Sequence, residues 1–243
     1  MLDYDTEADR YDASRGGVPR AGAAARAVLG LLPPDVRTLL DVGCGTGLVS
    51  ARISRPGLRV AGADASPGML RLAAARLGGA VVLADARRLP FADGTLDAVS
   101  AVWLLHLLPD AAPVVAECAR VLRPGGVLVA TVDKDASHDV GSDIDALLAP
   151  FRRPDASDGR ALVAGHAARH GLRPCGGASF TGHGQGRSPR SAAAGLAHGA
   201  YPSAIRVTER QAASLAASLA ALPDQDRPRP DPVYRLVALR KDV

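Results

Sequence analysis

The stretch over residues 37–50, read RTLLDVGCGTGLVS, constrains the fold more than any other part of the chain. Residues 38–42 form a short apolar run of the kind that makes a buried strand. Gly43, Gly45 and Gly47 follow at alternate positions, and a helix is expected directly after them. Glycine lets the backbone turn sharply and lets a ligand lie against the main chain, where the free N–H groups of the next helix face it. The stretch therefore predicts a strand, a ligand-binding glycine turn and a short helix.

The spacing of the glycines separates two kinds of ligand. A dinucleotide fingerprint requires a small residue five places after its first glycine. Counted from Gly43, that place holds Leu48. The pattern is instead D-x-G-x-G-x-G, with Asp41 inside the end of the strand. A tight turn in an unrelated α/β protein is the alternative interpretation, so the other motifs must decide.

Length and cysteine usage favour one intracellular domain. A chain of 243 residues is one domain with additions, and its core is large enough to need no disulfide or metal. The three cysteines are scattered, with neither metal-ligand nor disulfide spacing, which indicates a reducing, cytoplasmic setting. The start of the chain is acidic and polar, so no signal peptide is expected, and no apolar run is long enough to span a membrane.

Charge is distributed unevenly along the chain. Residues 1–149 carry 15 Lys and Arg against 18 Asp and Glu, whereas residues 150–243 carry 14 against 7. A basic second half suits an anionic substrate or a nucleic acid. Nucleic acid is disfavoured because the arginines are dispersed and aromatic residues make up only 3% of the chain, which leaves few surfaces for base stacking. A GC-rich genome would produce the same imbalance without any function.

Apolar runs alternate with helical patterns after the glycine turn. This alternation predicts a parallel, doubly wound α/β sheet with right-handed crossovers. Expected strands after the first are 58–63, 80–84, 98–102, 127–132, 173–181 and 234–239, and expected helices are 20–32, 48–54, 67–77, 110–122 and 158–170. Asp64 ends the second strand, and Ser66 with Pro67 begins the helix that follows it.

Four motifs occur in order, namely DVGCGTG, AGADAS, ADARRLPFADGTLD and LRPGG. Together they resemble the class I S-adenosylmethionine-dependent methyltransferases, in particular the UbiE-like small-molecule enzymes, although Leu96 stands where an aromatic residue is usual. The resemblance is close over residues 37–134 and loose over residues 1–20. It implies a Rossmann-like sheet of seven strands, mostly parallel, whose last strand lies antiparallel between the fifth and sixth. It also implies S-adenosylmethionine as cofactor and S-adenosylhomocysteine as product.

The resemblance assigns the cofactor contacts. Asp41 would lie near the cofactor's ammonium, and an acid at Asp64 is placed to accept both ribose hydroxyls. Asp85 would accept from the adenine amino group, and the N–H of Ala86 would donate to the ring. The full set of expected cofactor-binding residues is Tyr11, Arg15, Asp41, Gly43, Cys44, Gly45, Asp64, Ala65, Met69, Asp85, Ala86 and Val102.

Two segments flank this core within a single domain over residues 1–243. Residues 1–20, with the pattern YD…YD…R, resemble the segment that folds over the cofactor as a lid, and a tail that packs on the domain is the alternative. Residues 182–232, an insertion between the last two strands, are interpreted as a helical cap over the acceptor, in which Thr208 and Gln211 form a capping box. A surface decoration or an oligomer contact is the alternative interpretation of this insertion. The chain is expected to be a monomer or a homodimer.

Methyl transfer requires alignment of the acceptor more than strong catalytic groups, and a base matters only where the acceptor must lose a proton. His106, just beyond the fourth strand, is the expected base, and a structural histidine is the alternative. Trp103 would flank the sulfonium or belong to the core. His138, His183 and Arg187 are the other expected substrate contacts, and no metal site is expected.

The sequence therefore predicts methyl transfer to the O, N or C atom of a small molecule, and an anionic compound of secondary metabolism is the expected acceptor. Two alternatives remain open. One is a tRNA or rRNA methyltransferase that uses the basic second half as a phosphate track. The other is a non-catalytic module that binds S-adenosylmethionine.

Overall fold

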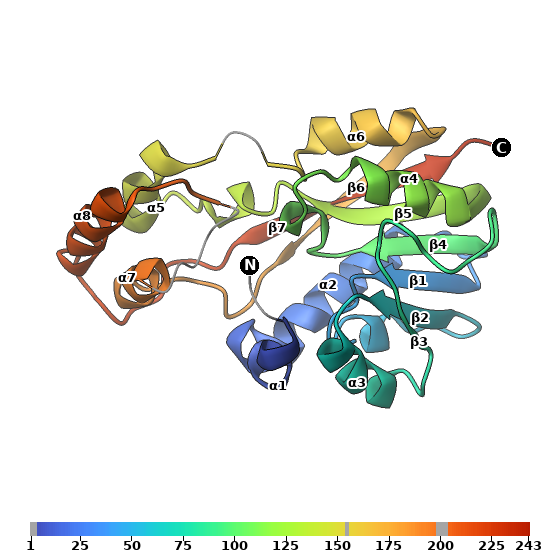
Figure 1. Ribbon diagram of the computed structural model, residues 1–243, viewed down its shortest axis with the longest axis horizontal. Coiled ribbons are helices and arrows are strands. Elements are labelled where there is room, and N and C mark those ends of the chain that lie inside the picture. Colours follow the sequence, from blue (N-terminus) through green and yellow to red (C-terminus); the bar gives the residue numbers. More distant parts are fainter. Residues whose placement is uncertain (1–3, 154–155, 198–203) are drawn as a thin grey trace.

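The computed structural model describes residues 4–153, 156–197 and 204–243, and it shows a seven-stranded sheet with helices on both faces (Figure 1). The strand order is β3-β2-β1-β4-β5-β7-β6, and every pairing is parallel except those of β7, which runs antiparallel to both β5 and β6. The strands are β1 (Thr38–Val42), β2 (Arg59–Asp64), β3 (Val81–Leu83), β4 (Leu96–Ala101), β5 (Leu122–Val132), β6 (Leu172–Thr181) and β7 (Val233–Lys241). The predicted doubly wound sheet with its antiparallel last strand is confirmed.

The helices that cover the sheet follow the predicted order with shifted ends. They are α2 (Gly17–Leu31), α3 (Pro67–Arg76), α4 (Ala112–Val121) and α6 (Arg160–Ala168). Ser66 caps α3 as predicted, accepting from the N–H of Met69 at 3.1 Å. By contrast, α4 begins after Ala111, and Asp110 only accepts from the N–H of Ala112 at 2.8 Å.

The helix expected over residues 48–54 is wrong in extent. Only a short 3₁₀ turn, η1 (Ser50–Arg52), forms there. The glycine turn uses the residues before it, and Pro56 with Gly57 ends the segment after it, so little room is left for a regular helix. The 3₁₀ turns η2 (Leu105–Leu107), η3 (Ala136–His138) and η4 (Ala149–Phe151) occupy later connections.

Successive residues of the central strands point into two apolar layers. Leu40, Val99 and Leu128 belong to the layer that contains α4 and α6, whereas their chain neighbours Leu39 and Ala98 belong to the layer that contains α2. A strand buried on both faces reads as a continuous apolar run, which is why the periodicity revealed these strands so clearly. The two layers fix the carboxyl ends of β1, β2, β4 and β5 at one edge of the sheet.

A separate helical cluster lies beyond that edge, and we call it the cap (Figure 1). It consists of α5 (Asp143–Leu148), α7 (Pro189–Ala197) and α8 (Glu209–Ala220). Its apolar cluster is made by Ile144, Leu148, Ala192, Leu196, Ile205, Leu215 and Leu219. The insertion over 182–232 supplies α7 and α8, and its residues 198–203 lie outside the described residues. The connection between β5 and α6 supplies α5, which periodicity did not reveal. The predicted capping box of Thr208 and Gln211 begins α8.

Candidate cofactor and acceptor site

The glycine turn follows β1 in the predicted place, and its three glycines have φ values of 69°, 55° and 73°. A Cβ on Gly43 would lie 2.8 Å from Cδ1 of Leu104, and a Cβ on Gly47 would lie 3.0 Å from Cα of Ala73. Nothing lies within 4 Å of the corresponding position on Gly45. Two of the glycines therefore permit close packing, whereas the middle one leaves open space against the main chain.

Asp64 joins the end of β2 to this turn. Its Oδ2 accepts from the N–H of Gly45 at 2.8 Å, and its Oδ1 accepts from the N–H of Ser66 at 2.9 Å. The structure thus brings together the acid, the glycine turn and the start of α3. Ala65 is the single residue between Asp64 and Ser66. A carboxylate oxygen can accept more than one hydrogen bond, so both oxygens retain capacity for ribose hydroxyls. That contact stays a prediction.

Asp41 lies in the interior rather than at the open face of the turn. Its side chain is 2% exposed, and it accepts from the hydroxyls of Ser50 at 2.5 Å and Ser100 at 2.7 Å. Burial raises the pKa of Asp41 to about 6, against the lowering effect of the two hydroxyls. These bonds tie β1 to β4 and η1. The expected contact with the cofactor's ammonium stays a prediction.

Cys44, Met69 and Val102 also contribute packing at this edge. A Cβ on Gly62 would lie 2.6 Å from Sγ of Cys44, and burial raises the pKa of that thiol. Met69 is 1% exposed and Val102 is 7% exposed. Any contact these residues make with a cofactor would therefore come mainly from backbone atoms or a small side-chain edge.

Asp85, which precedes Ala86, lies at the end of β3 as an exposed carboxylate. It pairs with Arg87, whose Nη2 lies 2.6 Å from Oδ2, and the hydrogen bonds from Arg87 lower the pKa of Asp85 to about 2. The carboxylate is therefore ionised over the physiological pH range. An adenine amino group would share this acceptor with Arg87.

Helix α1 (Tyr4–Ser14) covers the turn, although the periodicity of residues 1–20 did not predict a helix there. Asp5, Asp9 and Asp12 share one face of α1, because residues three and four apart are neighbours on a helix. Asp5 accepts from the hydroxyl of Ser66 at 2.6 Å and the N–H of Gly68 at 2.8 Å. Figure 1 shows α1 beside α3 accordingly.

The other two carboxylates of α1 bind further along the same surface. Asp9 pairs with Arg71 at 2.7 Å. Asp12 accepts from the hydroxyl of Thr46 at 2.7 Å and pairs with Arg76 at 2.7 Å. The N-terminal segment is thus attached directly to the two motifs expected to hold the cofactor.

Two tyrosines and an arginine of this segment lie together. The rings of Tyr4 and Tyr11 are 6.1 Å apart, and Cζ of Arg15 is 5.7 Å from the ring of Tyr11. Burial, and then the charges of Tyr11 and Asp64, raise the pKa of Tyr4 to about 12, against the opposing effect of Arg15. Tyr4 was missing from the expected site, although the repeat of Tyr-Asp at positions 4 and 11 was a signal for it.

Arg20 is the most informative residue that sequence reasoning missed. It is 7% exposed, and its Cζ lies 3.5 Å from the centroid of the Trp103 ring. Its Nη1 donates to the carbonyl of Arg15 at 2.7 Å, and no carboxylate pairs with it in the part of the chain that the structure describes. Burial lowers its pKa. A buried guanidinium without a counter-ion is costly, so this position suits an anionic ligand group.

Trp103 follows β4 with a φ of 57°, and its N–H donates to the hydroxyl of Thr131 at 3.0 Å. Its ring meets Phe180 at 5.6 Å and Tyr234 at 5.4 Å, both edge to face. Because Arg20 covers one ring face, that face is not available to a sulfonium. Trp103 therefore packs against core aromatic residues and also lies beside the buried guanidinium of Arg20.

His106 and His138 lie beyond β4 and β5. Within the described ranges, Nδ1 of His106 is buried without a hydrogen-bond partner. Nε2 of His138 lies 3.1 Å from the hydroxyl of Tyr234. Burial, reinforced by Lys134, lowers the pKa of each imidazole to about 3. Both are therefore neutral near physiological pH.

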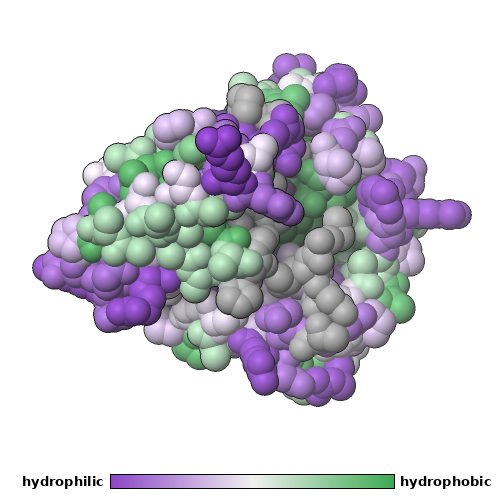
Figure 2. Space-filling model, turned by 60° about the vertical axis from the view of Figure 1, so that its left-hand side comes forward, coloured by the Kyte–Doolittle hydropathy of each residue, from purple (hydrophilic) through white to green (hydrophobic). Residues whose placement is uncertain are grey.

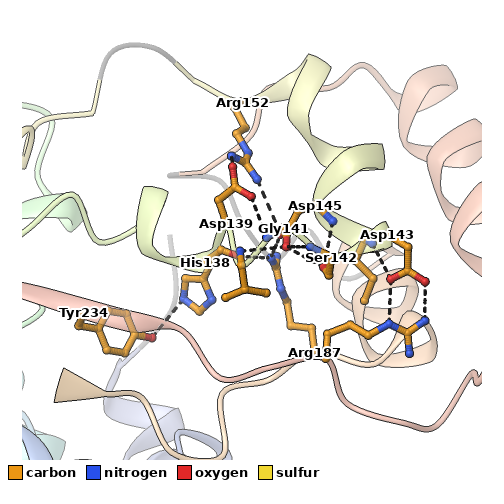
Figure 3. A network of polar contacts seen from close by, with 12 residues as sticks. His138, Asp139, Gly141, Ser142, Asp143, Asp145, Arg152, Arg187 and Tyr234 are labelled. Carbon is orange, nitrogen blue, oxygen red and sulfur yellow. Dashed lines mark hydrogen bonds and ion pairs between the residues drawn. The ribbon is translucent and has the colours of Figure 1, made fainter. Parts of the chain in front are cut away.

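Arg187, in the connection between β6 and α7, reaches the same region (Figure 3). Its Nη2 donates to the carbonyl of His138 at 3.2 Å and to Oδ1 of Asp145 at 3.1 Å. Asp145 is 3% exposed and also accepts from the N–H and hydroxyl of Ser142 at 3.0 and 2.6 Å. The structure thus brings together His138 and Arg187, two of the expected substrate contacts.

His183 occupies a different place. It lines a cavity of about 510 Å³ together with Val18, Pro19, Gly22, Arg26 and Arg52. None of the other expected site residues lines that cavity. A contact between His183 and the acceptor stays a prediction.

Figure 2 shows the molecule from the side of the cap, with a hollow whose deeper atoms belong to hydrophobic residues. No helix in the described ranges is long and apolar enough to cross a membrane. The same ranges contain no cluster of His, Cys, Asp and Glu arranged to hold a metal ion.

Comparison with known proteins identifies the central region. Residues 40–130 match a family described as "Methyltransferase domain". Demethylmenaquinone methyltransferase of Thermobifida fusca is 40% identical over 137 residues, which cover 52% of this chain and 57% of that protein. UbiE, the ubiquinone/menaquinone biosynthesis C-methyltransferase of Desulfotalea psychrophila, is 42% identical over 98 residues, covering 38% and 40%. The chain thus matches about half the length of these curated relatives.

Solved structures agree over nearly the whole fold. The [4+2]-cyclase SpnF has a TM-score of 0.63 at 22% identity, covering 99% of this chain and 94% of its own. Geranyl diphosphate methyltransferase, solved in complex with S-adenosylmethionine, has a TM-score of 0.53 at 21% identity, covering 90% and 85%. At these identities the similarity establishes the fold, not the reaction.

Proposed function

We propose that this chain, whose residues 40–130 match a methyltransferase domain, is a class I, UbiE-like enzyme that transfers a methyl group from S-adenosylmethionine to a small-molecule acceptor. The pairing of Asp64 with Gly45 carries the proposal, because it sets an acid beside an open glycine turn at the carboxyl edge of the sheet. The match of residues 40–130 to a methyltransferase family supports it.

The residues present fit this cofactor. The space at Gly45 would take its main body, and the unpaired guanidinium of Arg20 would be neutralised by its carboxylate, with Arg15 close by. Asp64 would accept the ribose hydroxyls and Asp85 the adenine amino group. When bound, the cofactor supplies a methyl group on a cationic sulfur. The protein holds and aligns the reactants and excludes water from them.

The acceptor would be an acidic compound that binds as an anion. His106, with a pKa of about 3, is a weak base that can still orient an acceptor by a hydrogen bond. The charges of Lys134, Arg20 and Arg15 disfavour a proton on His106, whereas Asp135, which pairs with Lys134 at 2.8 Å, favours one. Three positive charges against one negative charge favour an anionic acceptor nearby. An acceptor that has already lost its proton requires no strong base.

An RNA acceptor has less support than a small molecule. Four arginines of the basic second half are held by carboxylates, namely Arg152, Arg187, Arg190 and Arg229 with Asp139, Asp145, Asp226 and Asp143. Such pairs offer fewer free cations for a phosphate track. The cap and α1 would instead enclose a compact acceptor over the carboxyl ends of the strands.

Calorimetric titration with S-adenosylmethionine and, separately, with NAD tests the cofactor assignment. We expect binding of S-adenosylmethionine only, and Asp64→Ala should weaken it by roughly 1–3 kcal/mol because charged hydrogen bonds are lost. Asp93→Ala, an exposed carboxylate paired with Arg120, is the matched control and should bind as the wild type does. Binding of NAD, or of neither compound, would contradict the proposal.

Transfer of a labelled methyl group then tests the acceptor class. Phenols and carboxylic acids should be methylated faster than neutral analogues of the same shape. Lys134→Met should reduce this preference, and Lys134→Arg should restore most of it, because the charge rather than the length of the side chain is required. Equal rates on charged and neutral compounds would contradict an anionic acceptor.

A further inference from the structure

The cavity that His183 lines lies outside the site described above. Its walls come from three parts of the chain, namely the first half of α2, the η1 turn and the connection after β6. It is a pocket open to solvent, and its volume of about 510 Å³ is within the range of sites for small organic ligands. Because Asp64, the glycine turn, Trp103 and His106 are not among the residues that line it, the cofactor proposal does not account for it.

The lining of this cavity combines positive charge with an apolar surface. Arg26, Arg52 and His183 supply cationic or hydrogen-bonding groups, and no acidic residue lines the cavity. Arg52 uses one nitrogen, Nη1, to donate to the carbonyl of Leu48 at 2.8 Å, which leaves its other nitrogens available for a ligand. In the described part of the chain no carboxylate pairs with any of these three side chains. Val18, 55% exposed, and Pro19 supply the apolar part.

The wall that carries His183 is held in place by the structure. Asp231 accepts from three successive N–H groups, those of Gly184, Gln185 and Gly186, at 3.2, 2.9 and 2.7 Å. The connection also touches the turn before α2, since a Cβ on Gly16 would lie 2.0 Å from the carbonyl oxygen of His183. The opposite wall is a regular helix. The cavity is therefore formed before any ligand arrives, which lowers the entropic cost of binding.

We propose that this cavity is a second ligand site, which binds a small organic anion with an apolar body. The anionic group lies among Arg26, Arg52 and His183, and a guanidinium can bind a phosphate or carboxylate with two parallel hydrogen bonds. The apolar body lies against Val18 and Pro19. The site is independent of the cofactor and of the methylation reaction.

Calorimetric titration of the full chain with hexyl phosphate tests the proposal, with inorganic phosphate and 1-hexanol as probes of each half. Hexyl phosphate should bind at least about tenfold more tightly than either. Arg26→Gln and Arg52→Gln should each raise its Kd about tenfold or more, because each removes a charge-assisted hydrogen bond. Arg59→Gln, an exposed arginine on β2 that does not line the cavity, is the matched control.

A filled cavity provides a second, independent test. Gly22 lies within α2, and only Nη1 of Arg26 is within 4 Å of a Cβ placed there, at 3.4 Å. Gly22→Leu should therefore occupy the cavity while favouring the helix, and it should abolish hexyl phosphate binding without loss of circular dichroism. Saturating S-adenosylmethionine and the Asp64→Ala variant should both leave hexyl phosphate binding unchanged. The proposal would be overturned if the wild type did not bind hexyl phosphate, or if the arginine and Gly22→Leu variants bound it as tightly as the wild type does. Either result would hold whatever the outcome for the cofactor.

Discussion

Two helical structures, α1 and the cap, lie beyond the carboxyl ends of the strands, and they are attached in different ways. Helix α1 is attached by three carboxylates, and its outermost pair is largely exposed, with Asp9 at 75% and Arg71 at 62%. The cap has an apolar cluster of its own and a carboxylate, Asp145, that is 3% exposed. Helix α1 is thus attached largely through water-accessible polar groups, whereas the cap is held together by an apolar cluster of its own.

This difference predicts which cover can move. Exposed ion pairs contribute about 0–1 kcal/mol each, so α1 can leave the glycine turn at a modest cost. Opening the cap would expose apolar side chains at roughly 1.5–3 kcal/mol each. We therefore expect cofactor exchange to involve α1 and the cap to stay folded.

Asp145→Ala should lower the free energy of unfolding more than any other change, because it removes a buried polar group of the cap. The change removes the buried carboxylate that pairs with Arg187 at 3.1 Å, and it removes the capping box of α5. Loss of one partner of a buried ion pair costs roughly 3–5 kcal/mol. Urea unfolding measures the change. Asp143→Ala, which breaks the more exposed pair with Arg229, is the control and should cost about 1 kcal/mol or less. Equal losses would mean that the buried pair of Asp145 contributes no more to the stability of the cap than the pair of Asp143 does.

Gly68→Ala should detach α1 while leaving the cap intact. A Cβ on Gly68 would lie 2.9 Å from both Cα and the carbonyl oxygen of Asp5, so α1 must shift. Overpacking of this kind costs roughly 1–3 kcal/mol. Trypsin should cut the chain at Arg10 and Arg15 about tenfold faster in this variant. Gly30→Ala, where nothing lies within 4 Å, should be cut as slowly as the wild type.

Acid should loosen the cap side before it loosens α1. The pKa of His138 is lowered to about 3, chiefly by burial, so below pH 6.5 the unfolded chain binds a proton that the folded chain does not. This contribution to stability is complete above pH 6.5 and falls by up to about 1.4 kcal/mol per pH unit as the pH drops toward 3. Hydrogen bonds from Ser66 and Gly68 lower the pKa of Asp5, so its contribution is lost only below about pH 3.8.

Hydrogen exchange at pH 7 and pH 5, corrected for intrinsic rates, separates these responses. Protection should decrease around η3 and α5 and stay constant in α1. His138→Gln should reduce the pH dependence of the urea midpoint, with His106 supplying the remainder. An α1 that opened first between pH 7 and pH 5 would refute the assignment.

Asp9→Asn should have the smallest effect. Both members of its pair with Arg71 are mostly in water, so less than about 0.5 kcal/mol is at stake. Asp12→Asn is the more sensitive partner experiment, because Asp12 is 24% exposed and binds both Thr46 and Arg76. If trypsin cut the two variants at the same rate, the less exposed contacts of Asp12 would hold α1 no more strongly than the exposed pair of Asp9 does.

The cofactor side could be predicted from the sequence because its determinants are local. A buried strand reads as an apolar run, and the glycine turn, Asp64 and the Ser66 cap each follow a strand at short range. Their mutual contacts in the structure match that prediction. Tyr11 and Arg15 were expected on a lid, and the structure places them on or just after a helix that adjoins the turn.

The acceptor side could be predicted only in part, because distant segments build it. Helix α1 has few apolar residues, and its position depends on contacts with α3 more than 50 residues away. Arg20 reads as one more arginine in an amphipathic helix, and only its packing on Trp103 reveals a buried charge. Similarly, nothing local indicates that α5 joins α7 and α8.

Trp103 is the only tryptophan in the chain, and its ring stacks against the buried guanidinium of Arg20. Its fluorescence therefore comes from a single, known place. A ligand that drew Arg20 away from the indole would change the emission, whereas a ligand in the Arg26 cavity would leave it nearly constant. The protein thus contains its own optical reporter, and one stopped-flow trace could time cofactor arrival without any attached dye.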